Sequence, residues 1–122
     1  MSGSTQLLDE AVLNELRELS RELDQDVLGE VVTAYRKVAP ELLGNLEQAV
    51  GGRVFDALAR AAHTLKGSSA QIGAVAVRDL AREIEADARA ERGDRLALLV
   101  AQCRSAFAEV DAALARVIGE KS

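Results

Sequence analysis

Residues 95–118 read RLALLVAQCRSAFAEVDAALARVI and contain the clearest hydrophobic repeat of the chain. Apolar side chains recur here at alternating intervals of three and four residues, which gathers them on one face of an α-helix. The repeat predicts a long amphipathic helix whose apolar face lies in a protein core. Cys103 belongs to that face, so we interpret it as a small buried hydrophobe and not as a reactive thiol. The apolar positions are Leu96, Leu99, Cys103, Phe107, Val110, Leu114 and Val117.

Four further helices are predicted upstream of this repeat. Their expected ranges are 9–23, 26–50, 53–71 and 74–92. Asp9 and Asp26 are suited to begin the first two, because a carboxylate accepts hydrogen bonds from the free N–H groups of a first helical turn. Glycine readily adopts the left-handed conformation that follows a helix end. We therefore expect the second, third and fourth helices to end at Gly51-Gly52, Gly73 and Gly93-Asp94, respectively.

Apolar stripes on the first three of these helices predict which side chains are buried. The first stripe consists of Val12, Leu16, Leu19 and Leu23. The second consists of Leu28, Val31, Tyr35, Val38, Leu42, Leu46 and Ala49. The third consists of Val54, Leu58, Ala61, Ala62, Leu65 and Ile72. Pro40 lies inside the second helix and lacks a backbone donor, so we expect a kink or a short break there.

The length of 122 residues suits one domain, and a hydrophobic content of 48% with few aromatic residues favours helices over sheets. The fold class expected is therefore all-α. Because the predicted connections are short, the arrangement expected is an antiparallel up-and-down four-helix bundle with an additional N-terminal helix across one end. We place the domain at residues 8–118, with a flexible N-terminus over 1–7 and a C-terminal tail over 119–122.

Charge and cysteine content exclude several classes of function. A net charge of −5 has the wrong sign for binding the phosphate backbone of nucleic acids. One cysteine cannot form a disulfide within the chain, and no apolar stretch is long enough to enter a membrane as a helix. The sequence also lacks a phosphate-binding glycine loop and a cluster of metal ligands, so we expect no metal, no intrinsic cofactor and no enzymatic turnover. We expect a monomer in the cytoplasm.

The single histidine, His63, is predicted to point outward from its helix. At about 100° per residue it lies about 140° from Leu58, which stands in the middle of the apolar stripe. Small residues surround it on the same side, namely Ala59, Gly67 and Ala70. A glycine inside a helix costs about 0.5 to 1 kcal/mol relative to alanine, which is consistent with close approach of another protein there.

The residues next to His63 are suited to phosphoryl chemistry. A neutral imidazole is a nucleophile at cytoplasmic pH, and a phosphoryl group would add about two negative charges. Lys66 would offset part of that charge, and the hydroxyl of Ser68 could donate a hydrogen bond. A surface histidine taken alone is usually inert, so this interpretation depends on the surrounding residues.

The run HTLKGSS at residues 63–69 resembles the signature of histidine-containing phosphotransfer (HPt) domains. The resemblance extends over about residues 8–118. It implies that His63 accepts and donates a phosphoryl group, that Lys66 interacts with this group, and that Gly67 leaves room for a partner. The other segments that carry the resemblance are Leu8-Asp9, residues 39–43, Ala61-Ala62, residues 72–74, Ile84-Glu85 and residues 92–94.

Glu85 occupies the position where HPt domains often carry Gln or Glu near the histidine. A hairpin turning at Gly73 would bring position 85 level with position 63, so the carboxylate could orient the ring or simply pair with Lys66. The acidic residues of this helix otherwise have the pattern of a solvated face with weak ion pairs. They are Glu83, Glu85, Asp87 and Glu91.

The resemblance implies that the partners are receiver domains of response regulators, with a hybrid sensor histidine kinase as a further candidate. His63 would take a phosphoryl group from one receiver aspartate and pass it to another, with magnesium bound on the receiver. An apolar patch around His63 is expected to dock the receiver, formed by Ala59, Ala70, Val75 and Ala76. Two alternatives stay open: an interaction module that binds without phosphotransfer, and the acceptor domain of a larger histidine kinase.

Overall fold

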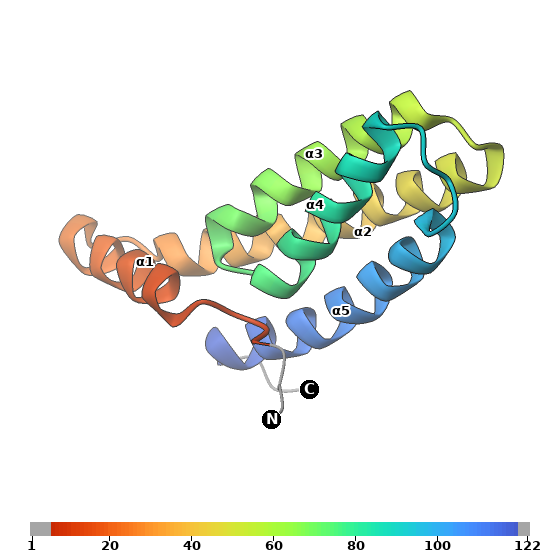
Figure 1. The fold of residues 1–122 in the computed structure, drawn as a ribbon. Helices are drawn as coiled ribbons and strands as arrows, with labels where there is room; N and C mark the ends of the chain where they lie inside the picture. Colours follow the sequence, from red (N-terminus) through yellow and green to blue (C-terminus); the bar gives the residue numbers. More distant parts are fainter. Residues whose placement is uncertain (1–5, 120–122) are drawn as a thin grey trace.

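The computed structural model describes residues 6–119, which form five α-helices and no strand (Figure 1). Helices α2, α3, α4 and α5 each pack against two of the others, in the cyclic order α2, α3, α4, α5 and back to α2. The apolar core lies between these four helices. The bounds are α1 Glu10–Leu23, α2 Val27–Gly52, α3 Phe55–Ile72, α4 Val75–Arg89 and α5 Leu96–Val117.

Two helices begin at the carboxylates that the sequence predicted as N-caps. The side chain of Asp9 accepts a hydrogen bond from the N–H of Ala11 at 3.0 Å, and that of Asp26 accepts one from Gly29 at 2.9 Å. Each interaction satisfies a backbone donor that the first helical turn leaves free.

The end of α2 differs from the prediction. The helix includes both Gly51 and Gly52, and the left-handed residue is Arg53, with φ 53°. The N–H of Val54 bonds back to the carbonyl of Ala49, which closes the helix end one residue after Arg53. The expected break at Pro40 is also absent, since α2 runs through this residue without interruption.

The turn between α3 and α4 requires its glycine. Gly73 has φ 78°, and a β-carbon there would lie 3.0 Å from that of Val12 and 3.1 Å from the carbonyl oxygen of Asp9. The N–H of Asp9 donates to the Gly73 carbonyl at 2.8 Å. The segment before α1 is therefore attached to this turn, and Leu7 and Leu8 pack half-buried against the core. Residues 1–5 and 120–122, which belong to the expected flexible end and tail, lie outside the described residues.

The buried face of α2 is shifted from the predicted stripe. Val38 is 40% exposed, and Val31 and Leu42 are only half-buried. Because α2 contacts both α3 and α5, its buried face is wider than one stripe. Val54, expected in the core, is exposed because it precedes the first turn of α3. The buried residues of α2 are Leu28, Val32, Tyr35, Ala39, Leu43, Leu46 and Ala49.

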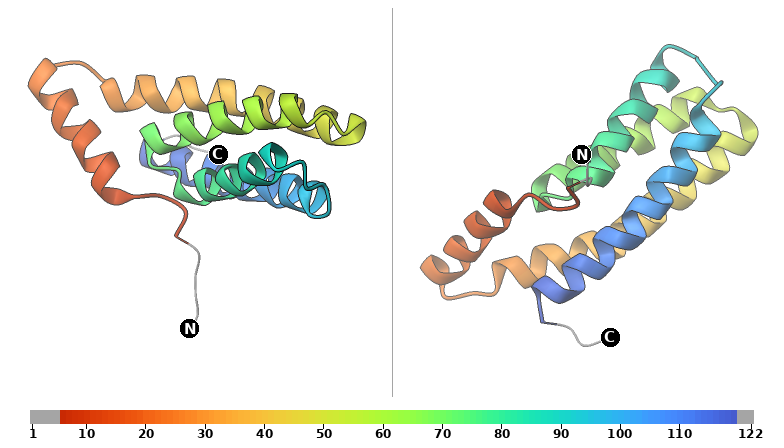
Figure 2. Two further views of the ribbon diagram at one scale, coloured as in Figure 1. Left: turned by 45° about the horizontal axis from the view of Figure 1, so that its top comes forward. Right: turned by 60° about the horizontal axis from the view of Figure 1, so that its bottom comes forward.

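Helix α1 lies at one end of the molecule and diverges from the other helices (Figure 2). It contacts only α2 and α3 among the described helices, and Leu13 is its one fully buried residue. Leu19 and Leu23 from the predicted stripe are 40% and 54% exposed. Half of this apolar stripe is therefore exposed, whereas Leu16 packs half-buried against the core.

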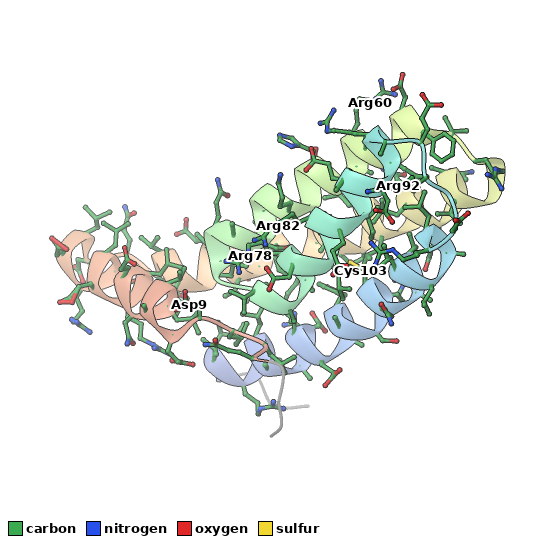
Figure 3. All side chains as sticks on the ribbon, in the orientation of Figure 1. Asp9, Arg60, Arg78, Arg82, Arg92 and Cys103 are labelled. Atoms are coloured by element: carbon green, nitrogen blue, oxygen red, sulfur yellow. The ribbon has the colours of Figure 1, made fainter. Side chains whose placement is uncertain are left out.

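Three helices meet at Tyr35. Its hydroxyl and that of Ser69 are 2.8 Å apart, and its ring lies 5.9 Å from that of Phe107. Burial raises the pKa of the Tyr35 hydroxyl, so this group stays neutral. Cys103 lies in the core as predicted (Figure 3), where burial raises the pKa of its thiol to about 12 and keeps it protonated. None of the described helices is long and apolar enough to cross a membrane.

We predict that Tyr35→Phe lowers the free energy of unfolding by about 1 to 3 kcal/mol, because it leaves the buried Ser69 hydroxyl without its partner. Ser69→Ala in the same chain should recover part of this loss, since no polar group is then left unpaired. Urea denaturation of the wild type, both single variants and the double variant measures the coupling. Strictly additive effects would show that the two hydroxyls do not interact.

Candidate functional site

His63 points outward from α3, as the helical spacing predicted, with 63% of its side chain exposed. The α3–α4 hairpin brings Glu85 beside it, so that Nδ1 of the imidazole lies 3.0 Å from Oε2 of the carboxylate. The ring is thus held along one edge only. Its other nitrogen, Nε2, is on the opposite edge of the imidazole.

Glu85 joins His63 to two cations. Its side chain is only 10% exposed, and its Oε1 accepts a hydrogen bond from Nζ of Lys66 at 2.6 Å. Arg89, one turn later on α4, donates to Oε2 from Nε at 3.0 Å and from Nη2 at 2.7 Å. A buried carboxylate requires such partners, because the loss of water would otherwise disfavour its charge.

The charge of Glu85 determines the tautomer of His63. Burial opposes ionisation, but hydrogen bonds from Lys66, Arg89 and His63 outweigh it and lower the pKa of the Glu85 carboxyl to about 2. An ionised carboxylate can only accept hydrogen bonds. Nδ1 of His63 must therefore carry the proton, and in the neutral ring Nε2 keeps its lone pair. The arrangement presents a nucleophilic nitrogen on an exposed edge.

The surface next to His63 is open toward Gly67 and Ala70. Gly67 and Ala70 are exposed, and a β-carbon on Gly67 would meet no atom within 4 Å. Ala59 and Ala76, expected to be part of an exposed patch, are 5% and 6% exposed and belong to the core. Helical spacing predicts on which side of its own helix each residue lies, but not how closely a neighbouring helix covers it. Val75 is half-buried.

The hydroxyl groups near His63 in the sequence do not gather around its ring. Ser68 is half-buried and lines a groove between α2 and α3 together with Tyr35 and Val38, whereas Glu85 approaches His63 from α4. Ser69 is buried against Tyr35, and the hydroxyl of Thr64 donates to the carbonyl of Arg60 at 3.1 Å. The structure therefore brings Lys66 into the cluster and leaves Ser68 on another face.

The acidic face predicted for α4 is divided into two kinds of side chain. Glu83 is exposed on α4, and Glu91 is exposed two residues after the helix ends at Arg89, but Glu85 and Asp87 are buried. Asp87 pairs with Arg92 at 3.3 Å and Arg95 at 3.1 Å, and holds the connection between α4 and α5. The sequence did not predict that Asp87 forms buried ion pairs or that Arg89 contacts Glu85. The four-residue spacing of Glu85 and Arg89 was the available signal.

We predict that Glu85 makes stability dependent on pH below about 4.5. Its folded-state pKa of about 2 lies below the ordinary value of 4.5, so its contribution is present above pH 4.5 and is lost as the pH falls toward 2. The difference in unfolding free energy between wild type and Glu85→Gln should shrink by on the order of 3 kcal/mol across this window. Chemical denaturation at a series of pH values measures it.

Glu83→Gln is the matched control, since Glu83 lies on the same helix and half of its side chain is exposed. The ion pair of Glu83 with Arg95, at 3.5 Å, is exposed and contributes little, so Glu83→Gln should change stability less than Glu85→Gln. A difference for Glu85→Gln that stays constant over the pH range would contradict an ionised Glu85 in the folded state.

Comparison with known proteins places the chain in a family. The family model of the Hpt domain matches residues 30–118. A solved structure, that of histidine-containing phosphotransfer protein B (HptB) from Pseudomonas aeruginosa PAO1, is similar over 93% of this chain and 95% of that chain. The TM-score is 0.83 and the sequence identity 27%. No curated protein matches the chain. The chain belongs to the Hpt domain family, and its role is histidine phosphotransfer in phosphorelays.

Proposed function

We propose that His63 accepts a phosphoryl group from the aspartyl phosphate of one receiver domain and passes it to the aspartate of another. The observation that carries this proposal is the pairing of His63 with Glu85. Nδ1 is held at 3.0 Å by a buried carboxylate, while 63% of the imidazole side chain remains accessible. Such a ring is oriented and still open to a partner.

The transfer is a displacement at phosphorus. The lone pair of Nε2 attacks the phosphorus in line with the bond to the aspartyl oxygen, the N–P bond forms, and the P–O bond breaks. The electron pair of that bond returns to the aspartate as a carboxylate. Positive charge that develops on the imidazole is stabilised by Glu85 through the Nδ1 hydrogen bond. Magnesium on the receiver would neutralise the phosphoryl oxygens, and Lys66 would interact with the group on His63.

The scaffold in this proposal is an antiparallel four-helix bundle of α2 to α5, with α1 as the additional N-terminal helix. The cyclic packing of α2 to α5 supports it. The receiver docks over the exposed positions Gly67 and Ala70, next to the imidazole. The chain contributes the nucleophile and the docking surface, and the receiver contributes the metal and the phosphorylated aspartate.

His63→Gln should abolish acceptance of the phosphoryl group from phosphorylated receiver domains of the source organism. The melting temperature should change little, because most of the His63 side chain is in solvent. Radiolabelled transfer and a thermal melt measure the two effects. The label on the wild type should be labile in acid and stable in base, as expected of phosphohistidine.

A chain that binds a receiver but never takes up label would be an interaction module and would contradict the transfer role. A large fall in the melting temperature of His63→Gln would contradict the exposed position of the ring.

Gly67→Leu should impair transfer through docking, because the new side chain occupies surface that a receiver must approach. We expect the receiver concentration for half-maximal rate to rise about tenfold, which corresponds to about 1.4 kcal/mol of binding. Gly51→Leu is the control. A β-carbon at Gly51 also meets no atom within 4 Å, but this residue lies at the C-terminal end of α2 and not on α3 beside His63. Equal transfer kinetics for both variants would exclude Gly67 from the docking surface.

A further inference from the structure

Arg89 shares an acceptor atom with the imidazole of His63. Oε2 of Glu85 accepts from Nδ1 of His63 at 3.0 Å and from Nε and Nη2 of Arg89 at 3.0 and 2.7 Å. The other oxygen, Oε1, accepts from Lys66. The guanidinium is thus within two hydrogen bonds of the ring that would carry the phosphoryl group.

Phosphorylation would change the balance of charges in this cluster. With a neutral imidazole, Glu85 is the one anion among His63, Lys66, Glu85 and Arg89, and it serves two cations. A phosphoryl group would add about 1.5 to 2 negative charges to the ring that shares Glu85 with these two cations. Two anionic groups then compete for them, and the new group has three acceptor oxygens.

Arg89 is the cation with the greater freedom to move. Its side chain is 59% exposed, whereas that of Lys66 is 32% exposed. A guanidinium can also bind phosphoryl oxygens with two parallel hydrogen bonds, which a lysine cannot do. Glu85 would keep its contacts with Lys66 and with Nδ1 of His63 if Arg89 moved.

We propose that Arg89 is a phosphoryl-binding residue of this site: once His63 is phosphorylated, the guanidinium leaves Oε2 of Glu85 and binds the phosphoryl oxygens. The proposal rests on phosphorylation of His63 and adds a second cation to the site. Before transfer, Arg89 holds the carboxylate that orients the ring. After transfer, it holds the group that the ring carries.

Arg82 provides a matched control on the same helix (Figure 3). Its side chain is 60% exposed, close to the value for Arg89, but it pairs with Asp79 at 3.2 Å and not with Glu85. Arg82→Gln and Arg89→Gln therefore remove the same charge from equally exposed positions of α4. Only the second removes a cation that contacts the His63 cluster.

The test uses the full chain phosphorylated on His63 with phosphoramidate, and it follows the ³¹P signal of the phosphoryl group during a pH titration. A cation that binds the phosphoryl oxygens favours their doubly charged form. Arg89→Gln should therefore raise the midpoint of the titration by about 0.5 to 1 pH unit, while Arg82→Gln leaves it near the wild-type value. Arg89→Lys should restore part of the shift. In the wild type, the Nε–H signal of Arg89 should also move on phosphorylation more than that of Arg82.

Equal midpoints for Arg89→Gln and Arg82→Gln, in proteins labelled on His63, would overturn the role of Arg89 and leave phosphotransfer intact. Labelling that persists in His63→Gln, or that never occurs in the wild type, would instead overturn the proposed function, and the role of Arg89 with it.

Discussion

The site depends on one buried carboxylate that must stay charged. Glu85 is 10% exposed and is surrounded on its polar side by donors from His63, Lys66 and Arg89. A buried anion without such donors would be protonated or would destabilise the fold. Because the donors hold it ionised, it can only accept from Nδ1, and this single requirement determines which imidazole nitrogen is available. Orientation, tautomer and local charge thus have a common cause.

The scaffold keeps this carboxylate and the imidazole at the same level of two packed helices. Helices α3 and α4 share the most extensive contacts of the described structure, and their apolar faces are buried at Leu65, Ile72, Val77 and Ile84. The reactive side chain can be largely in solvent because the backbone under it is held by the core. The His63 side chain is mostly exposed, whereas the helices that carry it and Glu85 are part of the core.

Periodicity and capping made most of the fold predictable. The repeat of α5, the caps at Asp9 and Asp26, and the outward direction of His63 all follow from spacing within one helix. The limits of this reasoning lie where two helices meet. Ala59 and Val38 have the wrong exposure in the prediction because spacing does not reveal where a neighbouring helix lies. Arg53 ends α2 although two glycines precede it, because a backbone bond from Val54 closes the helix there. For the site, the resemblance indicated Glu85, but only packing shows that this carboxylate is buried and shared.

The turn at Gly73 has a consequence far from its own position. It sets the register between α3 and α4. A side chain at this position would lie too close to Asp9 and Val12. One inserted residue after Gly73 would rotate α4 by about 100° about its axis and carry the carboxylate away from the ring. The length of this turn therefore matters to the site as much as the identity of its side chains, because it keeps the carboxylate of α4 level with the imidazole of α3.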